Sequence, residues 1–333
     1  MDEREAIRII GSTPTRSVGE GGSDFIERFK LAVEWADRAN WNAALIYTSN
    51  NALDPWLLAQ ILIQMTTNLR PLVAVQPIYE HPFTVANQAS TLTALYDRGV
   101  DFNFVAGDHP RDRESLNDTV EHDERYVRLS EYAQIVKQLF SFPRPVSFYG
   151  RYYTVSHLHL GQRPTSSIFP SFFMSGSSAA AREIASQIGA CAIEYPEEPG
   201  KAPQLPSSLS FSRGVRIGVI ARSSNGEAWD AAHRRFPPDI EGEAIRKFAA
   251  TASDSEWVKT LLHASAQEQA GAYWLSPFRR FQRACPYLVG SHEEVGAILK
   301  YYVSEGYRTF LIDAVESAEE ACCITELIRT AAA

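Results

Sequence analysis

The stretch Phe102–Pro110, FNFVAGDHP, joins a run of mostly apolar residues to a glycine and then to polar residues. An apolar run that stops at a glycine is typical of a buried strand that delivers a loop to a working surface. A second break of this kind occurs in FFMSGSSAAAREIASQIG, residues 172–189. Two such strand ends predict a site built from loops that lie on one face of the molecule.

Short apolar runs of this type recur along the chain, at residues 7–12, 43–49, 71–77, 102–107, 172–176, 190–195, 215–221 and 309–314. Most are near-continuous rather than alternating, as expected for strands that are covered on both faces. Helix-like patterns lie between them, among them SDFIERFKLAVEWADRAN, DPWLLAQILIQMTTNL and SHEEVGAILKYYVSEGY. The order of elements is therefore strand, helix, strand, helix.

This alternation predicts an α/β protein with a parallel sheet. Eight candidate strands favour a closed (β/α)8 TIM barrel over an open, doubly wound sheet, which is the alternative. The 333 residues fit a single barrel domain over 1–333, because such barrels reach about 250 residues or more with insertions. Residues 108–170 and 222–285 are too long for βα loops. We expect insertions after strand 4 (a helix and a hairpin) and after strand 7 (helices over the barrel mouth).

Charge and cysteine content exclude several classes of function. The formal net charge is −8 and no block of Lys or Arg occurs, so no nucleic-acid partner and no membrane partner is expected. No apolar run has the length of a signal peptide or of a membrane span, so the expected location is cytoplasmic. The four cysteines form no C-x-x-C pair and no zinc-type cluster, so no metal site is expected.

Three features are candidates for a binding site. The SGSS sequence before the helix-forming run at 179–188 could hold a phosphate with backbone N–H groups and hydroxyls, although a plain helix cap explains it too. His122 and Tyr126 are four residues apart on a predicted helix and can both donate to an anionic ligand; the alternative is a cap and a core tyrosine. Arg216 lies inside an apolar strand, so it must be paired or face a polar cavity.

Other residues carry weaker signals. Gln76 stands at the end of a predicted strand, and His81 precedes a proline in a loop where a lone histidine is more often structural. The chain has no dinucleotide-binding glycine motif, Walker loop, nucleophile elbow or zinc-protease motif. A phosphate-bearing organic cofactor would therefore have to carry the chemistry.

Several of these segments together resemble the bacterial luciferase-like flavin monooxygenases, most closely their alkanesulfonate monooxygenase branch. The segments are VAVQPIYEHPFTVANQASTLTAL, VDFNFVAGDHP, HDERYVRLSEYAQIVKQLF, VSFYGRYYTV, FFMSGSSAAAREIA, VRIGVIARSSNGEAWDAA and YLVGSHEEVGAILKYYVSEGYRTFLIDA. They occur in the family's order and spacing and cover nearly the whole chain.

The resemblance implies a (β/α)8 barrel that binds reduced FMN delivered by a separate NAD(P)H-dependent flavin reductase, uses O2 and oxygenates a small-molecule substrate. It implies at least a dimer, as a homodimer or homotetramer. It assigns the FMN phosphate to Ser177 and Ser178, with His122 and Tyr126 beside it. It assigns the ribityl chain or ring to Asn103, Ala106 and Gly107, and the ring edge to Gln76 and Thr48. Arg216 would anchor the oxygenated flavin or an anionic substrate group, and His81 and Tyr152 are candidate proton donors.

The chain departs from the alkanesulfonate branch at the catalytic positions. The family's cysteine and histidine near the first strands correspond to Ala52 and to the region of Ser12 and Thr13. Its Arg-x-His on strand 7 becomes Arg216 followed by Gly218, and its tyrosine and histidine after strand 8 become Val315 and Ser317. A sulfonate needs several donors and positive charges to offset its desolvation. We therefore expect the flavin chemistry to be kept and the substrate to be a different organic molecule, which is hydroxylated or N-oxidised in specialised metabolism.

Two other functions remain open. The first is a deazaflavin-dependent oxidoreductase, because that group shares the barrel. The second is a flavin-binding protein without turnover, which the loss of the family's histidine and tyrosine favours. Cofactor preference separates the first alternative from a monooxygenase, and oxygen activation separates the second.

Overall fold

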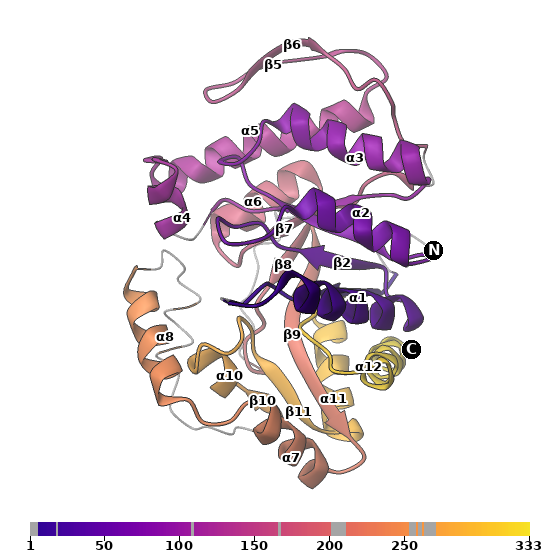
Figure 1. Ribbon diagram of the computed structural model, residues 1–333, viewed down its shortest axis with the longest axis vertical. Coiled ribbons are helices and arrows are strands. Elements are labelled where there is room, and N and C mark those ends of the chain that lie inside the picture. Colours follow the sequence, from indigo (N-terminus) through magenta and orange to yellow (C-terminus); the bar gives the residue numbers. More distant parts are fainter. Residues whose placement is uncertain are drawn as a thin grey trace.

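The computed structural model describes residues 6–17, 19–107, 110–165, 168–200, 211–252, 258, 262 and 271–333. Eight parallel strands close into a barrel, in the order β1–β2–β3–β4–β7–β8–β9–β12 and back to β1 (Figure 1). These strands are β1 (Arg8–Ser12), β2 (Ala43–Ile46), β3 (Arg70–Val75), β4 (Asp101–Phe104), β7 (Phe172–Ser175), β8 (Cys191–Glu194), β9 (Ser212–Arg222) and β12 (Tyr307–Ile312). The predicted (β/α)8 barrel is confirmed, and each of the eight predicted runs overlaps one of its strands.

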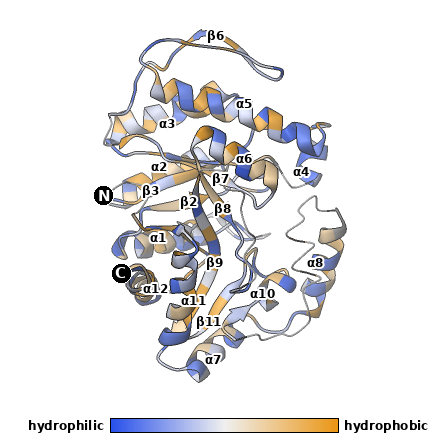
Figure 2. Ribbon diagram, turned by 180° about the vertical axis from the view of Figure 1, so that it is seen from behind, coloured by the Kyte–Doolittle hydropathy of each residue, from blue (hydrophilic) through white to orange (hydrophobic). Residues whose placement is uncertain are grey.

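Helices lie around the barrel, each formed by a segment with one apolar face. They are α1 (Gly22–Arg38), α2 (Pro55–Met65), α3 (Pro82–Tyr96), α5 (His122–Ser141), α6 (Ala179–Ile188), α11 (His292–Ser304) and α12 (Ala318–Ala332). In α1, for example, Phe25, Phe29 and Val33 repeat at helical spacing and are buried. Figure 2 shows hydrophobic and hydrophilic residues side by side on α3 and α5, as expected for helices between core and solvent.

The insertion after β4 contains the helix α4 (Pro110–Ser115), then α5, then the hairpin of β5 (Val146–Tyr149) and β6 (Thr154–Leu158). Both views of the molecule place this hairpin beyond α5, on the outside of the barrel (Figures 1 and 2). The helix and the hairpin expected after strand 4 are therefore present.

The insertion after β9 contains α7 (Asn225–Arg235), α8 (Ile240–Ala252), β10 (Tyr273–Trp274), α10 (Ser276–Arg279) and β11 (Tyr287–Ser291). The second half of β9 leaves the barrel and pairs with β11, which the apolar runs did not predict. Helix α7 packs against this extension, where Ala228 and Ala232 join a small core with Tyr287 and Val289. In both ribbon views α8 lies on the same side of the molecule as α4 (Figures 1 and 2).

Two segments are described only in part. The connection after β8 has no helix in its described residues 195–200, and residues 253–257, 259–261 and 263–270 of the insertion after β9 lie outside the described set. None of the helices in the described ranges is long and apolar enough to cross a membrane.

Candidate functional site

Side chains alternate between the two faces of each barrel strand, and this alternation decides what the interior contains. Val215 and Ile217 join the large core between barrel and helices, so Arg216 between them faces the interior. By the same alternation Asn103 faces inward from β4, between Phe102 and Phe104. The deeper interior is apolar, with Ile10, Ala43, Leu45, Leu72, Ala74, Phe173, Cys191, Ile193 and Leu311 in one cluster and Tyr47 packed against it. The site is thus a polar layer above an apolar plug, at the carboxyl ends of the strands.

Arg216 is the centre of this polar layer. Its Nη2 donates a hydrogen bond to the Tyr47 hydroxyl at 2.7 Å and lies 3.6 Å from Asp313 Oδ1. Its guanidinium carbon is 5.4 Å from the ring centre of Tyr47 and 5.9 Å from that of Tyr195. The expectation that this arginine is paired is met.

The ionisation of this cluster follows from its burial and its charges. Burial raises the pKa of the Tyr47 hydroxyl, so the phenol stays protonated at neutral pH. Burial alone would lower the pKa of Arg216, but Tyr47, Tyr195 and Asp313 outweigh it, and the pKa lies well above its ordinary value. The interior therefore holds a permanent positive charge beside a neutral hydroxyl donor.

Gly218 explains what replaced the second residue of the family's Arg-x-His pattern. Strand register places Tyr287 of β11 opposite Gly218, and a Cβ at Gly218 would lie 2.3 Å from the Tyr287 ring. The Tyr287 hydroxyl donates to Asp313 Oδ2 at 2.8 Å. The missing side chain thus makes room for an aromatic ring that holds the carboxylate beside Arg216.

Gly218→Ala should therefore lower the free energy of unfolding by about 1–3 kcal/mol, because the added methyl group displaces a packed ring. The matched control is Gly226→Ala in α7, where no atom lies within 4 Å of an added Cβ and helix propensity favours alanine. Urea unfolding of both variants measures the difference. Equal stability of the two variants would show that the Tyr287 ring moves aside without loss of unfolding free energy.

A second cluster lies at the first turn of α6. Ser178 caps this helix, accepting from the Ala181 N–H at 3.2 Å, and its hydroxyl donates to the Tyr126 hydroxyl at 3.3 Å. The Tyr126 ring packs edge-on against His122, with ring centres 5.3 Å apart. His122 begins α5, and its Nδ1 lies 2.9 Å from Asp123 Oδ1. Three of the four residues predicted around the phosphate are therefore in contact.

Gly176 keeps the space in front of α6 open. Its φ of +141° lies in a region that favours glycine, and a Cβ there would be 3.0 Å from Ala181 Cβ and 3.8 Å from the Tyr126 hydroxyl. The first N–H groups of a helix have no partner within the helix and point toward this space. Hydroxyls, N–H groups and a bare backbone together fit the phosphate of a flavin nucleotide. Ser177 lies next to this space, where its hydroxyl accepts from the Tyr195 N–H at 3.2 Å.

The remaining predicted cofactor residues connect neighbouring loops at the barrel mouth. Thr48 Oγ1 donates to the Ala74 carbonyl at 2.5 Å, and Gln76 Nε2 donates to the Thr48 carbonyl at 3.0 Å. Gly107 has a φ of +86°, and its carbonyl accepts from Arg113 Nη1 at 3.1 Å. Ala106 packs against the main core, and Asn103 Oδ1 accepts from Ser175 Oγ at 3.0 Å. The loops after β2 and β3 are thereby held together, and β4 is bonded to β7.

The two candidate proton donors lie elsewhere. His81 caps α3 by accepting from the Phe83 N–H at 3.2 Å, and its ring packs against Tyr153. Partial burial lowers the pKa of His81. Tyr152, in the turn of the β5–β6 hairpin, donates to Glu124 Oε2 at 2.5 Å. Among the described residues no interaction joins either of them to Arg216, so the structure does not bring the three predicted catalytic residues together.

The sequence analysis missed Tyr47, Tyr195, Asp313 and Tyr287. Tyr47 and Tyr195 lie inside predicted runs and directly after the observed strands β2 and β8, and Asp313 comes two residues after the interior residue Leu311. Side chains two residues apart on a strand point to the same face. Counting two residues beyond the interior residues Leu45, Ile193 and Leu311 would therefore have placed Tyr47, Tyr195 and Asp313 at the barrel mouth. Tyr287 belongs to the strand that the apolar runs did not predict.

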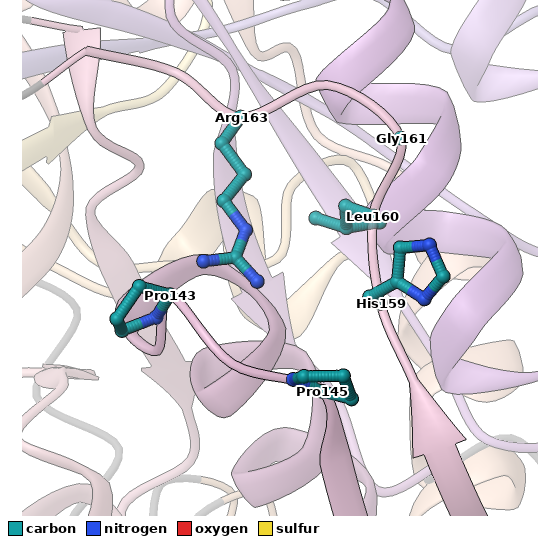
Figure 3. Close-up of a pocket in the computed structure, with 6 residues that line it drawn as sticks. All are labelled: Pro143, Pro145, His159, Leu160, Gly161 and Arg163. Carbon is teal, nitrogen blue, oxygen red and sulfur yellow. The ribbon is translucent and has the colours of Figure 1, made fainter.

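A separate pocket of about 440 Å³ lies at the foot of the β5–β6 hairpin. Figure 3 shows Arg163 pointing toward Pro143 and Pro145, with Leu160 and His159 on the other side. None of the predicted site residues lines this pocket, and it belongs to the outer insertion. It is therefore not the site discussed above.

Comparisons with known proteins show the family and the fold. The profile of luciferase-like monooxygenases matches residues 8–309. The chain is 28% identical over 326 residues to the 4-(gamma-L-glutamylamino)butanoyl-[BtrI acyl-carrier protein] monooxygenase BtrO of Niallia circulans, covering 95% of this chain and 94% of that protein.

Solved structures share the fold at low identity. Long-chain alkane monooxygenase LadA superposes with a TM-score of 0.72 at 18% identity, covering 97% of this chain and 90% of that one. The oxygenating constituent of 3,6-diketocamphane monooxygenase from the CAM plasmid of Pseudomonas putida, solved with FMN, gives 0.66 at 14% identity and coverages of 97% and 98%. An F420-dependent secondary alcohol dehydrogenase gives 0.62 at 15% identity and 98% of both chains. With its closed barrel and a profile match over most of its length, the chain belongs to the luciferase-like monooxygenase family.

Proposed function

We propose that this chain is the oxygenating component of a two-component, FMN-dependent monooxygenase. The observation that carries the proposal is the cluster of Ser178, Tyr126 and Gly176 at the N-terminus of α6, within a luciferase-like barrel. A separate NAD(P)H-dependent flavin reductase would supply reduced FMN, and O2 would be the second substrate. The expected cytoplasmic location stays a prediction from the sequence.

The residues divide into a phosphate end and a reaction end. Ser178, Tyr126 and the first N–H groups of α6 would hold the FMN phosphate, with His122 and Ser177 beside them. Asn103, Ala106, Gly107, Gln76 and Thr48 would line the ribityl chain and the ring. Bound reduced FMN would supply the electrons for oxygen activation. Arg216 would hold a fixed positive charge at the interior end, and Tyr47 would present a neutral hydroxyl there.

The substrate is proposed to be a small organic molecule other than an alkanesulfonate, which is hydroxylated or N-oxidised. The Asp313 carboxylate lies 3.6 Å from Arg216 and partly neutralises its charge. Of the catalytic positions compared with the alkanesulfonate branch, Arg216 alone keeps the residue of that branch. Because the relative BtrO is named for an acyl group on a carrier protein, carrier-bound amide acyl groups are the first substrates to test.

An anaerobic binding titration tests the cofactor assignment. Reduced FMN should bind at least tenfold more tightly than reduced riboflavin, because riboflavin lacks the phosphate that the α6 cluster would hold. Equal affinities would show that the cluster holds no phosphate. Tighter binding of reduced F420 than of reduced FMN would favour the deazaflavin-dependent alternative, which the F420-dependent neighbour keeps open.

The chain is also proposed to assemble as a homodimer or homotetramer. The neighbouring helices α1, α2 and α3 carry leucines that are 45%, 63% and 67% exposed, at Leu31, Leu57 and Leu95. Large apolar side chains that remain in water are candidates for an interface between copies.

A further inference from the structure

The insertion after β9 places an arginine, Arg246, against backbone carbonyls and aromatic rings. Arg246 on α8 donates from Nε to the Phe278 carbonyl at 2.8 Å and from Nη2 to the Arg283 carbonyl at 2.9 Å. Its guanidinium carbon lies 4.3 Å from the ring centre of Phe278 and 4.5 Å from that of Phe281. No carboxylate of the described residues pairs with it. The guanidinium is thus fixed in place by carbonyls and aromatic rings and not by an opposite charge.

Burial lowers the pKa of Arg246 to about 10, and the group that acts against this effect is the hydroxyl of Tyr195. Tyr195 also packs within reach of Arg216. Tyr195 therefore interacts electrostatically with Arg246 of the insertion and lies against Arg216 of the barrel. A desolvated cation without an anion is costly, and an incoming anion would offset that cost.

A third guanidinium completes the group. Arg283 Nε lies 3.6 Å from Asp313 Oδ2, while Arg216 lies 3.6 Å from Oδ1 of the same carboxylate. The Arg283 guanidinium also lies 5.5 Å from the ring centre of Phe236. We call Arg216, Arg246, Arg283, Asp313 and Tyr195 the cationic vestibule. Among the described residues two of its three guanidinium groups lie near one carboxylate and Arg246 lies near none, which leaves an excess of positive charge.

We propose that the outer part of the cationic vestibule, Arg246 and Arg283, binds an oxyanion of the substrate, a carboxylate or a phosphate, at a distance from the reacting atoms near Arg216. Guanidinium groups bind both oxyanions through paired hydrogen bonds. Arg216 faces the barrel interior, whereas Arg246 and Arg283 belong to the insertion outside it, so the anion holds the outer end of the substrate. Binding energy from such a remote group can orient the reacting end. This inference rests on the proposed function. It specifies that the substrate of the proposed monooxygenase is an anionic molecule.

Calorimetric titration with two probes, inorganic phosphate and glutarate, tests the vestibule. Arg246→Gln and Arg283→Gln should each raise the dissociation constant of the preferred probe at least tenfold, about 1.4 kcal/mol. Arg283 is 37% exposed on its side chain, so its replacement is the variant that leaves the packing least changed. Arg234→Gln on α7, an exposed arginine of the same insertion, is the matched control and should bind as the unchanged chain does. Tighter phosphate binding would indicate a phosphorylated or phosphate-tethered substrate, and tighter glutarate binding a carboxylic acid.

Two results would overturn the proposal. The first is the same dissociation constant in the unchanged chain and in both vestibule variants. The second is binding that is lost in Ser178→Ala but kept in Arg246→Gln, which would place the anion at α6. Failure of the proposed function is seen separately: if reduced FMN does not bind but the anion does, the cofactor assignment fails and the vestibule stands.

Discussion

Arg216→Met should lower the free energy of unfolding by about 3 kcal/mol or more, because it breaks a buried pair and leaves the Asp313 carboxylate without its interior partner. The Tyr47 hydroxyl loses its acceptor role in the same step. Methionine keeps most of the side-chain volume, so the loss reports on charge more than on a cavity. Urea unfolding at neutral pH measures it.

The double variant Arg216→Met with Asp313→Asn is the control for this result. Removing both charges should restore part of the lost stability, because no uncompensated carboxylate remains. If the loss of unfolding free energy in the double variant equals the sum of the losses in the two single variants, the two side chains do not interact. The 3.6 Å contact would then contribute nothing to stability.

The second large effect is expected at the phosphate end. Ser178→Ala with Tyr126→Phe should weaken reduced-FMN binding more than a hundredfold, because hydrogen bonds to a charged group contribute about 1.5–3 kcal/mol each. Each single variant should weaken binding about tenfold or more, since the two hydroxyls would bind the same phosphate. Anaerobic fluorescence titration with reduced FMN measures the affinities.

Ser130→Ala provides the comparison for this pair. Ser130 also lies on α5 and bonds Gln187 of α6, but on the exposed surface between the helices. The Ser130→Ala variant should bind reduced FMN with the same affinity as the unchanged chain. If the double variant binds reduced FMN as tightly as Ser130→Ala does, the α6 cluster does not hold the phosphate.

The barrel could be predicted from the sequence because each of its strands is a short apolar run with helical segments on either side. Because these strands are covered on both faces, their sequences are near-continuous apolar runs, and this makes them easy to assign as strands. The interior of the site was harder to predict, since its residues come from strand ends that are far apart in the sequence. Arg216 could be recognised because a charged side chain in an apolar strand must have a partner or polar surroundings. Tyr47 and Tyr195 are residues of a kind that is common in strands, so nothing in the sequence marked them.

The insertion after β9 was predicted, but the contacts that its residues make were not. The sequence suggested a pocket with few donors, because the positions compared lie on the barrel strands. Arg246 and Arg283 reach the mouth from α8 and from the segment after α10, and this placement depends on tertiary packing that no local pattern encodes. The same holds for Tyr287, whose position became visible only with the register of β11 against β9.

His81 and Tyr152 illustrate the opposite error of reading a reactive residue type as a catalytic one. His81 is used as a helix cap, and Tyr152 ties the hairpin to Glu124 of α5. Their assignment as proton donors stays a prediction, but their contacts give each a structural task. Tyr47, whose hydroxyl is held by Arg216, is the better placed hydroxyl donor.

The central claim is that this chain binds reduced FMN and directs its reaction with O2. The most direct test is rapid mixing of the anaerobic protein and reduced FMN with O2, followed by absorbance without substrate. The account predicts a species that is neither reduced nor oxidised FMN and that persists far longer than in free flavin, because the barrel excludes water. Reoxidation at the rate of free flavin, with full release of hydrogen peroxide, would contradict the account and favour a flavin-binding protein without turnover.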